Sequence, residues 1–183
     1  MSILQSSENF AKERHAGMIL NDGTTPHYEH LAAVVARLKN LGIMDEEVLA
    51  AAWLHDIVDY TNTTFDEIEQ RFGSKVGVLV LAVSKDKSLP KSKQEEQYMK
   101  QLKESSFEAK LIKVCDISAN FKDLKKSTVS KKKKVKEVKK SLHYLNIMKL
   151  DLIKNKSQVP SISNLITGIN EVITSFGLRS LMV

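Results

Sequence analysis

The sequence predicts an all-α protein, and three observations support this prediction. Only seven Gly and three Pro occur in 183 residues, while good helix formers such as Lys, Glu, Leu and Ala are frequent. Apolar residues recur at the three- and four-residue spacing of one helix face, and capping residues precede several of these segments. A chain of this length, with 42% hydrophobic and 27% charged residues, can bury a core. We therefore expect residues 1–183 to form a single helical bundle.

Turn and capping residues divide the N-terminal part into three expected helices. A turn cluster at 21–26 separates the first helix from the second, and Gly42 is a natural stop for the second. Asp45 can cap the third helix. The expected bounds are about Ser6–Ile19, about His27–Leu41, and a third helix after Asp45 that carries Leu49–Thr61.

Helix signals continue through the remainder of the chain. Thr64-x-x-Glu67 and Ser105-x-x-Glu108 are capping boxes. The apolar run Val76–Val83 fits either a buried strand or a buried helix, because periodicity alone does not separate the two. The expected helices are Phe65–Phe72, Lys93–Lys103, Ala109–Leu124, one that follows a Lys-rich segment and ends near Lys154, and an amphipathic helix after Pro160.

The stretch Leu49–Thr61 carries the first chemical cluster. At about 100° per residue, Asp56 lies about 100° from His55 around a helix and Asp59 about 40°, so the three share one side. An imidazole with two carboxylates can hold a divalent metal ion and keep a base beside it. The alternative is a helix end capped by solvated acids, with one half-buried histidine.

A second cluster lies on the expected helix 109–124. Asp116 and Asn120 are one turn apart, with Lys113 just before them, in an otherwise apolar segment. Burying a lone carboxylate is costly, so an Asp in this position has a partner or a metal ion, unless it caps a neighbouring loop.

The net charge of +6 comes from one segment. Lys125–Lys140 contains nine Lys and one Glu and carries +8, which leaves −2 for the remainder of the chain. The segment has no apolar stripe, so we expect an exposed patch that is dispensable for catalysis. Nucleic acid is not expected as a partner, because no aromatic residue interleaves the Lys run.

Other features of the sequence indicate the cellular compartment. The single Cys115 excludes an intramolecular disulfide and fits a reducing compartment. No apolar run reaches the roughly 18–20 residues of a membrane span, and the N-terminus lacks the pattern of a secretory signal. We expect a cytoplasmic protein without a membrane partner, and the sequence carries no signal for an oligomeric state.

In chain order, the candidate metal ligands are His30, the pair His55-Asp56, and Asp116. This H…HD…D order on successive helices resembles the HD hydrolase superfamily, and most closely the guanosine tetraphosphate hydrolase domain of the RelA/SpoT proteins, including the stand-alone small hydrolases of metazoan type. The matching segments lie between Phe10 and Leu124. They are His15-Ala-Gly, Pro26-x-x-x-His30, Leu49-x-Ala-Ala-x-Leu-His-Asp-x-Val-Asp59, Thr63-Thr-x-x-Glu67, Phe72-Gly73, Ser84-Lys-Asp-Lys-x-Leu-Pro-Lys91 and Ala109-Lys-Leu-x-Lys-x-x-Asp116-x-x-x-Asn120-x-x-Asp-Leu124.

The resemblance implies an all-α HD domain, in which Val76–Val83 is helical. The family match covers about residues 10–124, and the basic segment and C-terminal helices of 125–183 would complete the bundle. The resemblance further implies one divalent metal ion, Mn²⁺, and a small-molecule nucleotide substrate. The implied metal ligands are His30, His55, Asp56 and Asp116.

The implied reaction is the removal of the 3′-pyrophosphate from guanosine-3′,5′-bis(diphosphate). Asp59 takes the position of the family's catalytic base. Asn120 falls where the family contacts the sugar–phosphate region of the nucleotide, and Lys113 and Tyr60 are also expected to bind substrate.

The chain departs from the family pattern around the substrate. Tyr60 replaces an acidic residue, and a phenol with a reference pKa of about 10 is not a base near pH 7. Leu20 replaces an arginine that packs on guanine, which implies weaker selection of that base. His27 replaces an aromatic residue, and we expect a surface-loop histidine, the alternative being a polar contact to substrate. His15 is expected to pack against the site or orient it, not to bind metal.

Two functions of different classes follow. The first is the metal-dependent phosphohydrolase. The second is an HD-fold binding module with weak or no turnover, in which the Lys-rich segment contacts an acidic or nucleic-acid partner. The complete ligand set favours the first, because unpaired buried acids are costly without a cation.

Overall fold

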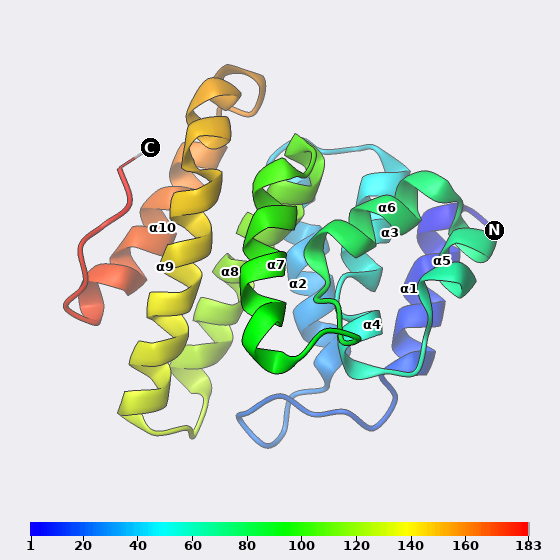
Figure 1. Ribbon diagram of the computed structural model, residues 1–183, viewed down its shortest axis with the longest axis horizontal. Coiled ribbons are helices and arrows are strands. Elements are labelled where there is room, and N and C mark those ends of the chain that lie inside the picture. Colours follow the sequence, from blue (N-terminus) through cyan, green and yellow to red (C-terminus); the bar gives the residue numbers. More distant parts are fainter. Residues whose placement is uncertain (183) are drawn as a thin grey trace.

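The computed structural model describes residues 1–182, and this part of the chain is helical except for its turns and an isolated β-bridge between Ile19 and Pro26 (Figure 1). The prediction of an all-α fold is confirmed. None of the helices within residues 1–182 is long and apolar enough to cross a bilayer. The helices are α1 (Ile3–Arg14), α2 (His27–Asn40), α3 (Glu46–Leu54), α4 (Ile57–Tyr60), α5 (Phe65–Phe72), α6 (Ser74–Val83), α7 (Lys91–Glu104), α8 (Phe107–Lys126), α9 (Lys131–Lys154), the 3₁₀ turn η1 (Lys156–Gln158) and α10 (Ile162–Ser175).

Helix α8 is the central element of the fold, since it contacts α2, α3, α6, α9 and α10. Its first turn is capped by the Ser106 hydroxyl, which accepts a hydrogen bond from the Ala109 amide at 3.2 Å. The cap is therefore Ser106, one residue after the predicted Ser105. Buried side chains, among them Leu111, Ile112 and Val114, cover several faces of α8, because neighbouring helices surround it.

Helix α3 is the second buried element and lies against α1, α2, α6 and α8. Asp45 caps it as predicted and accepts hydrogen bonds from the amides of Glu47 and Val48. Every residue from Val48 to Leu54 is buried, and three consecutive alanines in this run let neighbouring helices approach closely. The end of α3 is thus held on all sides, which fixes the position of the His55-Asp56 pair that follows it.

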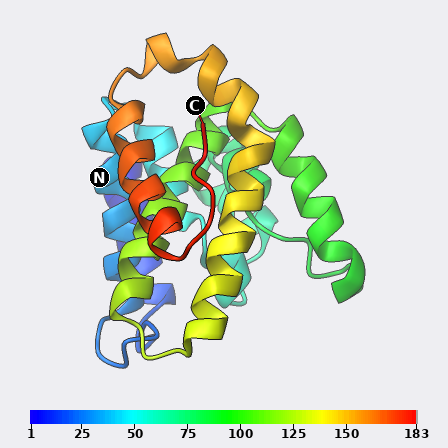
Figure 2. The ribbon, with the colours of Figure 1, turned by 90° about the vertical axis from the view of Figure 1, so that its left-hand side faces the viewer.

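The C-terminal helices cover the other side of α8. Helix α10 packs on α8 through the buried residues Ile162, Ile166, Ile169, Val172 and Ile173, and α9 contacts both α7 and α8. Figure 2 shows α7 at the edge of the molecule, beside α9. The segment Val76–Val83 lies within α6, so the helix that the family resemblance implied is the correct alternative.

Two predicted helices end earlier than expected. The first stops at Arg14 instead of Ile19, because Gly17 adopts φ 78° and the chain then turns back to bridge Ile19 with Pro26. The helix that was predicted to carry Leu49–Thr61 is broken after Leu54, and the short helix α4 begins at Ile57. The 100°-per-residue argument for His55, Asp56 and Asp59 therefore does not hold across this break.

We expect Cys115 to resist alkylation in the folded protein. Its side chain is completely buried in α8, and burial raises the pKa of the thiol to about 12, so little thiolate exists at about pH 8. Intact mass after iodoacetamide treatment should stay unchanged in native buffer and increase by one adduct in concentrated guanidinium chloride. Rapid modification of the native protein would show that α8 is more accessible than its packing indicates.

Candidate functional site

The break between α3 and α4 places two adjacent polar residues over the core. The ring of His55 is buried, and its Nδ1 donates a hydrogen bond to the Ala52 carbonyl oxygen at 2.8 Å. This bond fixes the ring and leaves Nε2 directed at carboxylates, with Asp56 Oδ1 at 3.4 Å and Asp116 Oδ1 at 3.6 Å. Among the described residues, none forms a hydrogen bond with this buried Nε2.

Helix α2 contributes His30 to the same cluster. Its Nδ1 donates to Asp123 Oδ2 at 2.9 Å, while its Nε2 lies 3.2 Å from Asp116 Oδ1 and 4.0 Å from Asp56 Oδ2. A carboxylate behind one ring nitrogen fixes the orientation of the imidazole and raises the basicity of the other nitrogen, as is usual for histidines that bind metals. Both His30 and His55 therefore present Nε2 to one point.

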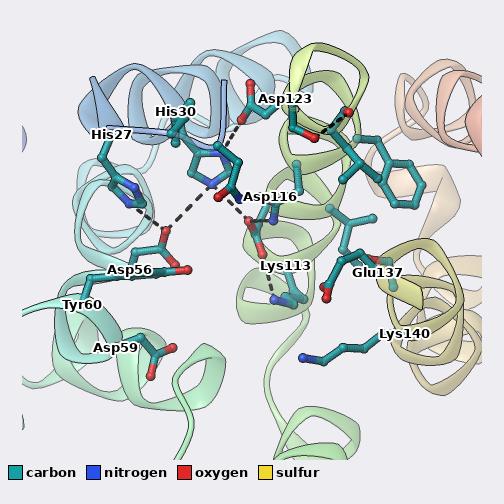
Figure 3. Close-up of a pocket in the computed structure, with 18 of the residues that line it drawn as sticks. His27, His30, Asp56, Asp59, Tyr60, Lys113, Asp116, Asp123, Glu137 and Lys140 are labelled. Atoms are coloured by element: carbon teal, nitrogen blue, oxygen red, sulfur yellow. Dashed lines mark hydrogen bonds and ion pairs between the residues drawn. The ribbon is translucent and has the colours of Figure 1, made fainter. Parts of the chain in front are cut away.

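Asp116 lies on α8 and closes the cluster from the opposite side (Figure 3). Its Oδ2 accepts a hydrogen bond from Lys113 Nζ at 2.7 Å, and its Oδ1 accepts one from Asn120 Nδ2 at 2.6 Å. Lys113 is itself held between the rings of Tyr98 and Tyr144, 5.6 and 5.4 Å from their centroids. Asn120 and Lys113, both predicted to contact substrate, thus contact Asp116.

The cluster attracts positive charge strongly. Burial alone would lower the pKa of His30, but hydrogen bonds with Asp116 and Asp123 raise it to about 10. The pKa of His55 is likewise raised, because Asp56 and Asp116 outweigh the effect of burial. Burial opposes ionisation of Asp56 and Asp116, yet the surrounding cations hold both carboxyl pKa values below their ordinary range. Two ionised carboxylates therefore face two imidazoles whose pKa values are both raised.

This donor set fits a divalent metal ion. His30, His55 and Asp56 each offer one ligand atom, and these atoms lie within 4.8 Å of one another. Asp116 brings a further oxygen within 3.2 Å of His30 Nε2. Imidazole nitrogens with carboxylate oxygens suit a borderline transition metal. A cation at this point would also be coordinated by the buried Nε2 of His55, which otherwise lacks a hydrogen-bond partner.

The prediction that His27 is a surface-loop histidine is wrong. It is the first residue of α2, only 7% exposed, and its Nε2 donates to Asp56 Oδ2 at 3.0 Å. Its ring stacks on the buried ring of His15 with centroids 4.7 Å apart, and Tyr60 covers it at 5.0 Å. His27 therefore orients Asp56, and His15 packs behind it, with its own Nδ1 donating to Ala11.

The cluster opens into a cleft of about 640 Å³, a volume typical of small-molecule sites. Asp59 and Tyr60 line it from α4, and Leu20 lines it from the loop between α1 and α2. Burial, together with the charge of Asp56, raises the pKa of Asp59, and Asp56 and burial raise the pKa of Tyr60 to about 12.

The Lys-rich segment forms part of this cleft, which was not predicted. Most of its lysines are exposed, but α9 turns Lys133, Glu137 and Lys140 toward the cleft, and Figure 3 shows Glu137 and Lys140 opposite His30, Asp56 and Asp116. These positions are three or four residues apart and form one stripe of the helix. The expected exposed patch is present, but one stripe of it faces the cleft, and its dispensability for catalysis stays a prediction.

The site also contains residues that the sequence reasoning missed. Asp123, two turns after Asp116 on α8, anchors His30, and its spacing could have indicated this role. Tyr144 lines the cleft from α9, beyond the segment that carries the family motifs. His143, its neighbour, is exposed and contacts Met99.

Comparisons with known proteins agree with this geometry. Residues 8–144 match the HD domain family. The chain is 40% identical over 129 residues to guanosine-3′,5′-bis(diphosphate) 3′-pyrophosphohydrolase MESH1 of Danio rerio, which covers 69% of this chain and 72% of that protein. It is 37% identical over 135 residues to the enzyme of the same activity name from Aquifex aeolicus, covering 72% of this chain and 19% of the bacterial protein. A solved structure of a metazoan ortholog of SpoT that hydrolyses ppGpp has a TM-score of 0.83 at 27% identity, with 98% of each chain covered. The chain therefore belongs to the HD domain family, and its resemblance to the RelA/SpoT hydrolases is confirmed.

Proposed function

We propose that the protein is a metal-dependent phosphohydrolase that removes the 3′-pyrophosphate of guanosine-3′,5′-bis(diphosphate). The observation that carries this proposal is the buried Nε2 of His55, which faces Asp56 and Asp116 without a hydrogen-bond partner at the base of an open cleft. The activity names of the relatives supply the substrate. We infer the cytoplasm as the compartment, because the chain has a single, buried cysteine.

We propose Mn²⁺ as the cofactor, with His30, His55, Asp56 and Asp116 as its ligands. When bound, such a cation polarises a phosphate and lowers the pKa of a water molecule. Behind the ligands, Asp123 orients His30, His27 orients Asp56, and the Ala52 carbonyl orients His55. These contacts keep the ligand atoms converged before the cation arrives, which reduces the cost of binding it.

The residues of the chain divide the remaining work between proton transfer and substrate binding. Asp59 lines the cleft close to the proposed ligand Asp56. Its pKa is raised in the direction of neutral pH, as suits a general base. Tyr60 stays protonated and can only donate a hydrogen bond to substrate or orient it. Lys113 and Asn120 border the cleft and supply donors toward a phosphate or sugar oxygen.

We also propose that the HD hydrolase domain extends beyond the family motifs at 10–124 to the C-terminal helices. Helices α9 and α10 pack on α8, the helix that carries Asp116, and Lys140 and Tyr144 of α9 line the cleft. A hydrolase that ended after α8 would lack one wall of this cleft.

The first prediction concerns metal retention. His55→Ala or Asp116→Ala should abolish stoichiometric Mn²⁺ retention after dialysis, because each removes a ligand from the cluster, while circular dichroism should show a helical chain. His143→Ala and Asp66→Ala, at exposed positions outside the cleft, are the matched controls and should retain the metal. A wild-type protein without metal after dialysis against Mn²⁺ would contradict the site.

The second prediction is that metal affinity increases with pH. The pKa of His30 is raised to about 10, so in the metal-free protein this ring carries a proton at about pH 6.5 that a cation must displace, and the raised pKa of His55 adds to this competition. As pH rises toward about 10, this competition disappears, and the stabilisation that protonated His30 gives the metal-free fold is lost as well. Calorimetry with Mn²⁺ between about pH 6.5 and 8.5 should show proton release and an affinity gain on the order of tenfold or more. A pH-independent affinity without proton release would contradict it.

The third prediction tests the base. Asp59→Asn should reduce turnover of guanosine-3′,5′-bis(diphosphate) by about a hundredfold or more, because a positioned general base contributes about 10²–10⁴-fold. Metal content should not change, since Asp59 is outside the ligand set. Asp66→Asn, an equal change at an exposed position on α5, should leave turnover unaffected. Full activity of the Asp59 variant would assign proton transfer to another group.

A further inference from the structure

A second charged cluster borders the cleft, away from the metal-binding residues. It joins Lys85 from the loop after α6, Glu95 from α7 and Lys140 from α9. The Lys85 ammonium group donates a hydrogen bond to Glu95 Oε2, and Lys140 Nζ lies 4.0 Å from the same oxygen. The other oxygen of Glu95 accepts a hydrogen bond from the Tyr144 hydroxyl. Both lysines and Tyr144 line the cleft, so the cluster faces the same space as the metal-binding residues.

The two ammonium groups of this cluster share a single carboxylate. Glu137, about one turn before Lys140, adds a second negative charge that attracts Lys140, but the two cations still repel each other. The side chains of Lys85 and Lys140 are 26% and 41% exposed, so water screens the repulsion between them incompletely. Burial and the neighbouring Lys85 lower the pKa of Lys140. An anion bound between the two lysines would relieve this repulsion.

The position of the cluster relates it to the substrate. In Figure 3, Lys140 enters the cleft from α9, on the side opposite Asp59 of α4. Glu137 and Lys133 precede Lys140 by about one and two turns on the same stripe, so the wall formed by α9 keeps a net positive charge. A phosphate cleaved near His55 and Asp116 therefore lies on one side of the cleft, and the cationic wall lies on the other.

We propose that Lys85 and Lys140, held by Glu95, form an anion site for the phosphate group of the nucleotide that is not cleaved. This inference rests on the proposed function and adds to it: the enzyme selects nucleotides that carry phosphate at both the 3′ and the 5′ position. Lys85 and Lys140 are specificity-determining residues in this arrangement, and Tyr144 positions Glu95 between α7 and α9.

The test is a binding measurement on the Mn²⁺-loaded protein. Guanosine 3′,5′-bisphosphate and guanosine 3′-monophosphate are titrated by calorimetry, with phosphate release monitored so that binding is measured before turnover. In the wild-type protein the 5′-phosphate should improve affinity by about tenfold or more, as expected for charge-assisted hydrogen bonds. Lys140→Gln and Lys85→Gln should each remove most of this gain and leave the affinity for the monophosphate unchanged, whereas Lys140→Arg should preserve it.

Lys139→Gln is the matched control, because Lys139 adjoins Lys140 on α9 but is exposed and does not line the cleft. It should leave both affinities unchanged. An equal loss in the Lys139 and Lys140 variants, or a Lys140 variant that still discriminates between the two ligands, would overturn the anion site. Discrimination that depends on Lys140, in a protein that does not hydrolyse guanosine-3′,5′-bis(diphosphate), would support the anion site and refute the proposed reaction. Hydrolysis of guanosine-3′,5′-bis(diphosphate) without any affinity gain from the 5′-phosphate would support the proposed reaction and refute the anion site.

Discussion

The carboxylate of Asp116 is the charge on which the arrangement of this molecule depends. It is buried on the central helix α8, where an ionised group is tolerated only if other charges and donors surround it. Lys113, Asn120, His30 and His55 supply them, from α8 itself, from α2 and from the end of α3. Helices α2 and α3 also pack against α8. The polar cluster and the hydrophobic core thus constrain the same helices to the same positions.

This coupling also fixes the link between α3 and α4. His55 and Asp56 lie at a break between two helices, and such a link could move if its flanks were loose. Here α3 is buried along its length, the ring of His55 is bound to the Ala52 carbonyl, and His27 holds Asp56. The packed run of small residues in α3 therefore supports the cluster through its packing and through the Ala52 carbonyl oxygen, which accepts a hydrogen bond from His55. Substitution of these alanines by larger residues would overpack the core around α3 and displace His55 and Asp56.

The sequence predicted the parts of this structure that depend on local spacing. The helix after Asp45 begins where its cap predicts, the helix Phe65–Phe72 has the expected bounds, and the ordered motif from His30 to Asp116 indicated the family. It could not predict which surface a helix presents to a cleft formed by distant segments. His27 follows a turn and a proline, which is typical of an exposed position, yet Asp56, 29 residues later, makes it a buried donor. Lys140 was likewise assigned to solvent, because a run of lysines carries no signal that one stripe of it faces a cavity.

The two sides of the cleft therefore differ in how tightly the fold fixes them. The side that carries His30, His55 and Asp116 lies between helices that pack on one another through the core, so changes there affect both folding and chemistry. The opposite wall comes from α9 and from the loop after α6. Tyr144 is buried in this wall, whereas Lys85 and Glu95 meet at partly exposed positions. Surface-type interactions of this kind contribute little to stability, so the residues of this wall can change with small cost to the fold. An HD domain built in this way can keep its metal centre while the wall formed by α9 adapts to a different nucleotide.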